Sequence, residues 1–354
     1  MSGLSCREKC IVHNFESFFG EDGHLKRHSR NSNPAFTLQV MKLGLIQNFT
    51  IIDIGARGGP VSLWKPLETI ISYIGFDQDS NECERLNREK YNFKSATFLP
   101  YIIGRKKEVR NFFITKFPYS SGLIKGNQKF TARIAPEHEE HLTVLRSTPV
   151  ETHSLDEVVV KHKINTVDYI KIDTEGSEHE VLEGARKIVQ EYNLLGVETE
   201  FWLGPIKENL PHGNLNSIFS FFNDSTFQMF DISYRRYARR SLGNGPIYQG
   251  HCDNSIQGQI LTGDILFLRD PINEMEQGNT NFTWNDETVL KLACLYEISM
   301  LNDCALELLD YYKANFPTTL PVDELADILV PPVAVTLNLK RQQYLSLTGY
   351  SPQK

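Results

Sequence analysis

The segment 167–185 reads V-D-Y-I-K-I-D-T-E-G-S-E-H-E-V-L-E-G-A and joins a predicted buried strand to a predicted helix. The strand, residues 167–172, runs into an acidic loop that contains Asp173, Glu175 and Gly176. Beyond the loop, apolar residues recur with the 3.6-residue period of a helix that packs on a sheet. A strand that leads directly into a helix is typical of α/β folds with a mostly parallel sheet.

Strand-forming runs continue on both sides of this segment and alternate with helical ones. A helix is predicted from Pro34 to about Gln47, and two more helices, with a break near Asn302, are predicted within 286–315. Serine and glutamate three residues apart predict capping boxes that begin at Ser154 and Ser177. We expect strands at 50–54, 72–76, 96–102, 110–115, 167–172, 194–200, 227–232 and 264–268.

Length and charge limit the classes of protein that fit. The 354 residues suggest an N-terminal extension (1–47), a sheet domain (48–271) and a helical C-terminal extension (272–354). The net charge of −7 disfavours nucleic acid as the main partner, because such proteins are usually basic. No apolar run has the length of a signal peptide or a membrane span. The six cysteines are scattered, so we expect reduced thiols and a cytoplasmic protein.

A glycine loop follows the first predicted strand, where residues 51–60 read I-I-D-I-G-A-R-G-G-P. Its glycines let the backbone approach a ligand closely, and a helix directly after the loop would add partial positive charge. Asp77 lies 24 residues after Asp53, just past the second strand. An acid at that point can accept hydrogen bonds from both ribose hydroxyls of an adenosine. The combination favours an adenosine cofactor over a glycine turn that binds nothing.

The charge of the loop narrows the choice of cofactor. The dinucleotide fingerprint G-x-G-x-x-G is absent, and the carboxylate of Asp53 would repel a pyrophosphate. A carboxylate there suits a cofactor that carries an ammonium group, such as the methionine part of S-adenosylmethionine. The sequence therefore favours a methyl donor over NAD.

The acidic loop has two interpretations. Ligands of open α/β sheets bind at the carboxyl ends of strands, so Asp173 and Glu175 are expected at the same crevice as the glycine loop. There they would act as a general base, position a hydroxyl or bind a divalent cation; alternatively, they stabilise the helix N-terminus. Glu198 and Glu200 share one side of the next strand and join the cluster only if they lie at its end.

Together these motifs resemble the FkbM-type family of class I S-adenosylmethionine-dependent methyltransferases. The resemblance covers about residues 48–271, and the I-D-T-E-G-S-E part is its most specific segment. The matching motifs are D-I-G-A-R-G-G, G-F-D-Q-D, S-S-G-L, S-L-D-E, the run from Asp168 to Ala185, G-V-E-T-E-F and G-Q-I-L-T-G-D-I-L-F-L-R-D-P.

The resemblance implies a Rossmann-like α/β fold: a seven-stranded, mostly parallel sheet with one antiparallel strand and helices on both faces. It also implies S-adenosyl-L-methionine as cofactor and O-methylation of a hydroxyl on a sugar, glycan or polyketide-like molecule. The residues implied to line the cofactor are Asp53, Gly55, Ala56 and Gly58 at its methionine end, Asp77 and Gln78 at the ribose, Tyr101 and Ile102 at the adenine, Ser121 nearby, and Asp173 facing the methyl group. Arg57 is also expected at the cofactor loop but departs from the family pattern, and its charge would either steer an anionic substrate or be solvated.

Methyl transfer to oxygen needs an aligned acceptor and a group that takes or shares its proton. Asp173 and Glu175 are the preferred candidates for the base, or for ligands of a divalent cation if one is used. Histidine is the other candidate class, and His251 is the best placed because its glycine-flanked loop precedes the last strand. His153 and His179 are further candidates. For each histidine a structural role is the alternative.

The basic run 233–240, S-Y-R-R-Y-A-R-R, is either a grip for phosphate or an acidic glycan or a solvated loop. Two other functional classes stay open: a nucleotide-dependent oxidoreductase on a similar sheet, and a non-catalytic binding module. The C-terminal helices would form a homo-oligomer contact or a substrate lid. We expect a small-molecule or glycan acceptor rather than nucleic acid.

Overall fold

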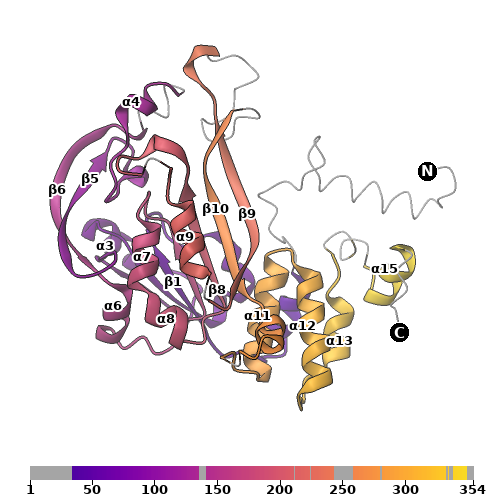
Figure 1. The fold of residues 1–354 in the computed structure, drawn as a ribbon. Coiled ribbons are helices and arrows are strands. Elements are labelled where there is room, and N and C mark those ends of the chain that lie inside the picture. Colours follow the sequence, from indigo (N-terminus) through magenta and orange to yellow (C-terminus); the bar gives the residue numbers. More distant parts are fainter. Residues whose placement is uncertain are drawn as a thin grey trace. The chain divides into compact units, whose positions relative to one another are not determined.

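The computed structural model describes residues 34–134, 141–210, 212–223, 225–242, 258–279, 281–331, 334 and 338–348. The chain divides into two compact units, which are described separately (Figure 1). The sheet unit comprises Thr50–Pro60 and Ile71–Pro271. The helical unit comprises Met1–Phe49, Val61–Ile70 and Ile272–Lys354.

A seven-stranded sheet forms the centre of the sheet unit. The paired strands β1 and β7, β7 and β8, and β2 and β3 are parallel, whereas β10 is antiparallel to both of its neighbours. This confirms the predicted mostly parallel sheet and its antiparallel strand. In spatial order the strands are β3 (Ser95–Leu99), β2 (Ile71–Phe76), β1 (Phe49–Ile54), β7 (Tyr169–Ile172), β8 (Gly196–Trp202), β10 (Gln259–Arg269) and β9 (Phe227–Tyr237).

One apolar core joins a face of this sheet to four helices. Alternate residues of the central strands, such as Ile52 and Ile170, point into it together with Val181 and Ile188. The predicted helical stripe is therefore a packing face. The helices are α6 (Leu155–Lys161), α7 (Glu178–Gly184), α8 (Arg186–Glu191) and α9 (Leu215–Phe222); α3 (Ser80–Arg88) follows β2.

A second, three-stranded sheet consists of β4 (Ile102–Ile103), β6 (Val144–His153) and β5 (Glu108–Thr115). The single strand predicted at 96–102 is wrong, because β3 ends at Leu99 and Ile102 begins β4 in this other sheet. Strand β6 was not predicted, because only one of its ten residues is buried and it contains Pro149.

The helical unit confirms the two helices within 286–315 and their break. The helix predicted from Pro34 ends earlier than Gln47, at Lys42. Its first turn is held by Glu297, whose carboxylate accepts hydrogen bonds from the backbone N–H groups of Phe36 (3.0 Å) and Thr37 (2.7 Å). The elements are α2 (Ala35–Lys42), the 3₁₀ helix η1 (Ser62–Ile70), α10 (Pro271–Glu276), α11 (Asp286–Ile298), α12 (Asn302–Asn315), α13 (Val322–Ile328) and α15 (Arg341–Thr348). None of the helices in the described ranges combines the length and the apolar character that crossing a membrane requires.

Candidate active site

The glycine loop follows β1, and its backbone N–H groups bond within the chain. Gly55 and Ala56 both donate to the carbonyl oxygen of Phe76 at 2.9 Å, and Gly58 donates to Glu82 Oε1 at 3.0 Å. The helix predicted after the loop is present as the 3₁₀ helix η1, which begins at Ser62 and buries Trp64 and Leu67.

Gly55 brings the glycine loop into direct contact with the acidic loop. The N–H of Asp173 donates to the carbonyl oxygen of Ile54 at 2.9 Å. Gly55 has φ +90°, and a Cβ atom there would lie 1.9 Å from the backbone oxygen of Asp173. Only glycine fits this close approach. The two loops that the sequence placed at one end of the sheet are thus in direct contact.

Asp53 is buried beneath the loop and is engaged by the chain itself. Tyr73 donates a hydrogen bond to its Oδ2, and Lys171 Nζ on the neighbouring strand lies 3.6 Å from its Oδ1. Burial raises the pKa of Asp53, although Lys171 and Tyr73 oppose this shift. Its Oδ1 is buried and accepts no hydrogen bond from the described residues.

Asp77, at the end of β2, is bound by Arg57 of the glycine loop. The Arg57 guanidinium lies 3.2 Å from Asp77 and 3.0 Å from Asp79, and Asp77 also accepts the N–H of Asp79 at 2.7 Å. Burial raises the pKa of Asp77 despite these partners. Gln78, beside it, is half-buried. The carboxylate predicted to hold a ribose therefore has an internal cation as its partner.

The remaining predicted cofactor residues lie around these two loops. Tyr101 contacts the ring of Phe76 edge-on at 6.2 Å, next to Asp77, and Ile102 follows it as the first residue of β4. Ser121 Oγ accepts a hydrogen bond from the N–H of Thr115 at 3.1 Å. The glycine after Ser121 packs tightly on the acidic loop, since a Cβ there would lie 2.9 Å from the backbone oxygen of Thr174.

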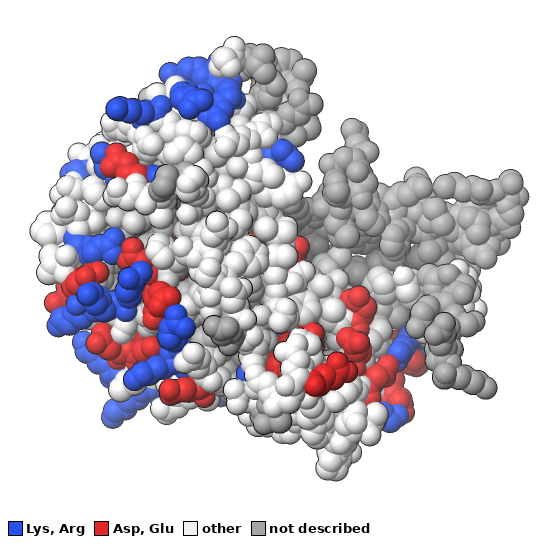
Figure 2. All heavy atoms as spheres, viewed as in Figure 1, with Lys and Arg blue, Asp and Glu red and all other residues white. Residues whose placement is uncertain are grey.

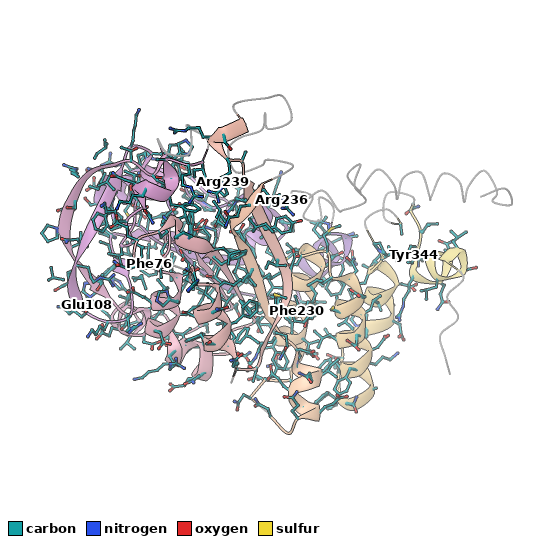
Figure 3. The ribbon with its side chains drawn as sticks, turned by 45° about the horizontal axis from the view of Figure 1, so that its top comes forward. Phe76, Glu108, Phe230, Arg236, Arg239 and Tyr344 are labelled. Atoms are coloured by element: carbon teal, nitrogen blue, oxygen red, sulfur yellow. The ribbon has the colours of Figure 1, made fainter. Side chains whose placement is uncertain are left out.

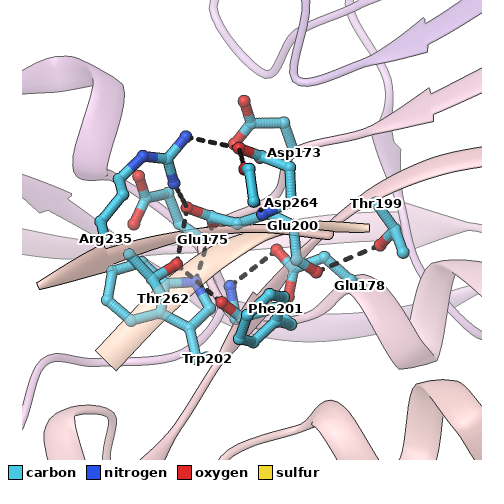
Figure 4. Close-up of polar contacts among 12 residues, drawn as sticks. Asp173, Glu175, Glu178, Thr199, Glu200, Phe201, Trp202, Arg235, Thr262 and Asp264 are labelled. Atoms are coloured by element: carbon cyan, nitrogen blue, oxygen red, sulfur yellow. Dashed lines mark hydrogen bonds and ion pairs between the residues drawn. The ribbon is translucent and has the colours of Figure 1, made fainter. Parts of the chain in front are cut away.

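Three carboxylates converge at the ends of β7 and β8 (Figure 4). One oxygen from each of Asp173, Glu175 and Glu200 lies within 4.8 Å of the others. Glu200 therefore belongs to the acidic cluster. The sequence alone did not decide its membership. Glu198 does not belong to this trio; it accepts a hydrogen bond from Tyr169 at 2.8 Å. Glu175 has φ +61°, an uncommon backbone conformation for a residue other than glycine.

Each carboxylate of the trio has a cation beside it. Lys171 lies 3.1 Å from Asp173, and Arg235 of β9 lies 3.3 Å from Glu200. Lys207, with 1% of its side chain exposed, lies 2.9 Å from Glu175 and over the ring of Trp202. The sequence did not predict that these three cations pair with the carboxylates, although Arg235 lies in the basic run 233–240. Strand alternation could have found Lys171, which shares a side with Asp173.

These surroundings give the three carboxylates different acidities. Burial alone would raise the pKa of Asp173, but Lys171, Arg235 and Lys207 outweigh it and lower that pKa. Burial raises the pKa of Glu175, with Lys207 opposing the shift. Burial and the neighbouring carboxylates raise the pKa of Glu200 well above its ordinary value. Asp173, whose side chain is 41% exposed, is thus the readily ionised member.

The helix after the acidic loop begins differently from the prediction. The capping box at Ser154 is present, but Ser177 makes no cap hydrogen bond to its helix. Instead the buried Glu178 accepts the N–H groups of Thr174 (3.0 Å) and Gly176 (2.9 Å), which fixes the acidic loop. Burial raises the pKa of Glu178 to about 7.

The histidines add no member to the acidic cluster among the described residues. His153 is half-buried and pairs with Glu151 at 3.2 Å. His179 is on α7, where burial lowers its pKa. His251, the histidine favoured by sequence, lies outside the described residues.

One comparison with protein-family models gives a match. Residues 70–228 match the model described as the methyltransferase FkbM domain. This part of the chain is therefore similar to an FkbM methyltransferase domain. The match includes Asp77 and the whole acidic loop, whereas the glycine loop precedes it and β10 follows it. A search of curated proteins finds no match.

Solved structures of methyltransferases are distantly similar to this chain. Magnesium protoporphyrin IX methyltransferase from Synechocystis, with bound S-adenosylmethionine, is 8% identical at a TM-score of 0.32, covering 76% of this chain and 99% of that one. A protein assigned as a prophage DNA modification methyltransferase of E. coli is 8% identical at a TM-score of 0.32; the alignment covers 64% of this chain and 48% of that one, about half its length. An S-adenosylmethionine-dependent methyltransferase from Methanosarcina mazei is 11% identical at a TM-score of 0.29, covering 65% and 96%. The similarity of this chain to methyltransferases rests on the match of residues 70–228 to the FkbM domain model and on the seven-stranded sheet.

Proposed function

We propose that the protein is an S-adenosylmethionine-dependent O-methyltransferase whose acceptor is a hydroxyl of a sugar, glycan or polyketide-like molecule. The observation that carries the proposal is the contact between the glycine loop and the acidic loop through Gly55 and Asp173, next to the FkbM domain's Asp77. It brings a cofactor-type loop and an exposed carboxylate to one edge of the sheet. We assign this role to residues 48–271 and an oligomer contact to the C-terminal helices.

The residues present fit the cofactor in its polar parts. The buried Oδ1 of Asp53 accepts no hydrogen bond from the described residues and has the ammonium of Lys171 3.6 Å away, so it suits an ammonium donor. Gly55, Ala56 and Gly58 would face the methionine end. When bound, S-adenosylmethionine supplies a methyl group activated on a sulfonium. No phosphate cradle competes for this assignment, because the N–H groups of Gly55, Ala56 and Gly58 bond within the chain.

Asp77 would hold the ribose, with Tyr101 and Ile102 at the adenine, provided that Arg57 releases its carboxylate. We therefore expect D77N to weaken binding of S-adenosylhomocysteine about tenfold, because one charge-assisted acceptor is lost. R57Q, which frees Asp77 of its internal partner, should keep or strengthen binding. Isothermal titration measures both. Equal affinity of D77N and the unmodified protein would contradict the assignment.

In this proposal Asp173 orients the acceptor hydroxyl and Glu175 takes its proton. Asp173 stays ionised and exposed, so it accepts the hydroxyl's hydrogen bond and fixes its direction. Burial raises the pKa of Glu175, which makes its carboxylate the more basic of the two and the proposed proton acceptor. Ser121 and His251 remain proposals for contacts to the cofactor and the acceptor.

The same carboxylates are also candidate ligands for a divalent cation. The oxygens of Asp173, Glu175 and Glu200 are close enough to share one ion. A cation there would have to displace Lys207 and Arg235 from their partners. We therefore propose a reaction that proceeds without added metal. Activity abolished by a chelator and restored by magnesium would contradict this.

The test of the proposed function begins with the cofactor. Titration with S-adenosylhomocysteine and with NAD should show binding of the first only. Extracts of glycans and small molecules incubated with a radiolabelled methyl donor should then yield a labelled, base-stable ether product. Preference for NAD would favour an oxidoreductase, and cofactor binding without any transfer would favour a non-catalytic module.

A further inference from the structure

Two arginines lie against one aromatic ring. Arg239 comes just after the carboxyl end of β9, and Arg133 comes from a separate segment of the chain. The guanidinium carbon of Arg239 is 4.9 Å from the centre of the Phe130 ring, and that of Arg133 is 5.6 Å from it. Backbone contacts fix this arrangement: Ile134 and Arg239 form an antiparallel bridge, and Arg240 donates its N–H to the oxygen of Arg133 at 3.0 Å. The pair is therefore built into the fold.

The two positive charges have no carboxylate partner among the residues that the structure describes. Arg239 donates to the side-chain oxygen of Gln259, while its Nη1 is buried without a hydrogen-bond partner. Burial and the charge of Arg133 lower the pKa of Arg239. Two mutually repelling guanidinium groups and an unbonded buried donor are what an anion would satisfy.

Figures 2 and 3 show the setting of this pair. Lys and Arg gather over α4 (Gln128–Thr131) and the end of the β9–β10 pair, and Arg239 lies at that end. Because β9 and β8 are both antiparallel to β10, their carboxyl ends lie at the same edge of the sheet. The arginine pair is thus at the edge that carries the acidic cluster.

A small apolar cluster connects the two sites. Phe130 packs together with Tyr237 and Trp202, and Trp202 Nε1 donates to Glu200 at 2.8 Å. Arg235, two residues before Tyr237 on β9, reaches Glu200 from the same side of the strand. The arginine pair and the acidic cluster are therefore linked through these packed side chains.

We propose that Arg133 and Arg239 bind a phosphate monoester group of the methyl acceptor. A phosphate monoester carries between one and two negative charges near neutral pH and several acceptor oxygens, which matches two guanidinium forks better than a single carboxylate does. The part of the inference that concerns the acceptor rests on the proposed function, whereas binding of phosphate itself does not.

Titration with inorganic phosphate tests the site directly. At low ionic strength the unmodified protein should bind phosphate more tightly than acetate. R133Q and R239Q should each weaken phosphate binding about tenfold or more, as expected for lost charge-assisted hydrogen bonds. R133K and R239K, which keep the charge but lose the fork, should weaken it less.

Arg186 supplies the matched control. It also lies on an aromatic ring, 4.8 Å from the centre of Phe221, but it has a carboxylate partner, Glu183, at 2.8 Å. R186Q should bind phosphate like the unmodified protein. Equal weakening by R186Q, or no phosphate binding by the unmodified protein, would overturn the proposal. Binding that appears only after the glutamates of 135–140, outside the described residues, are changed to glutamine would overturn it too.

Two further readouts separate this inference from the proposed function. Every arginine variant should bind S-adenosylhomocysteine normally, which also shows that it is folded. Pretreating the acceptor extract with phosphatase, removed before the assay, should abolish methyl labelling. Phosphate binding without S-adenosylhomocysteine binding would contradict the methyltransferase alone, whereas cofactor binding and labelling that resist phosphatase would contradict the phosphate acceptor.

Discussion

The acidic cluster and the arginine pair share one edge of the sheet but differ in how their charges are balanced. Asp173, Glu175 and Glu200 each have a cation of the chain within 3.3 Å. Arg133 and Arg239 have no carboxylate partner in the described part of the chain. Arg133 is exposed and Arg239 is half-buried, so water reaches these two charges and an anion in solution can approach them. The balanced cluster fits the proposed reaction site, and the arginine pair fits the proposed phosphate site.

The largest effect is expected from Asp173, the exposed carboxylate of the cluster. D173N should lower turnover by about 100-fold or more, because the acceptor loses the group that orients it. Affinity for S-adenosylhomocysteine should stay within about threefold. E208Q, which removes a surface carboxylate paired with Lys125, is the control and should retain activity. Unchanged turnover of D173N would show that the cluster has no role in the reaction.

Lys207 tests the balance of charge itself. K207M should destabilise the fold by about 3–5 kcal/mol, because it leaves the buried Glu175 without its cation. R239Q should change stability by less than about 1 kcal/mol, since removing it also relieves repulsion with Arg133. Urea denaturation measures both. Similar losses of stability for K207M and R239Q would contradict the difference in charge balance between the acidic cluster and the arginine pair.

Gly55 tests the contact between the two loops. G55A should destabilise the protein by about 3 kcal/mol, because the new methyl group collides with the backbone of Asp173 and the positive φ is strained. Gly44 also has a positive φ, +64°, but nothing lies within 4 Å of a Cβ there. G44A should therefore cost only about 1 kcal/mol. Equal free energies of unfolding for G55A and G44A in urea denaturation would mean that the two loops move apart at little cost.

Glu178 predicts an effect that depends on pH. Its pKa is about 7 in the folded protein and near 4.5 when unfolded, so the folded state binds more protons between these values. The free energy of unfolding should therefore fall as pH rises from 4.5 to 7, by about 3 kcal/mol from this residue. E178Q should flatten this fall in urea denaturation at pH 5 to 8. A slope equal to that of the unmodified protein would contradict the shift.

Much of the fold could be predicted because buried strands and helical stripes have distinct apolar periods. The central strands β1 and β7 are such runs, and their burial matches the prediction closely. Strand β6 lacked this signal because its environment is mostly solvent. Local sequence also could not predict that Glu178, rather than Ser177, would hold the acidic loop, since both residue types occur at helix starts.

The candidate site was predictable in its carboxylates and not in its cations. Asp173, Glu175 and Asp77 follow strands, so topology alone brings them to one edge. Lys207 comes from a distant segment, and no periodicity links it to Glu175. The pairing of Arg57 with Asp77 was not predicted either, because spacing does not encode the direction of a loop side chain. The arginine pair combines two segments about 100 residues apart, which only the folded chain shows.

The position of β10 between β8 and β9 has a consequence for biosynthesis. A ribosome delivers β9 before β10, yet in the sheet β9 is hydrogen-bonded to β10 and not to β8. Until Arg269 has emerged, the nascent sheet ends at β8 with an open edge, and β9 has no partner. The interval between those two moments is when we expect the chain to need chaperones most.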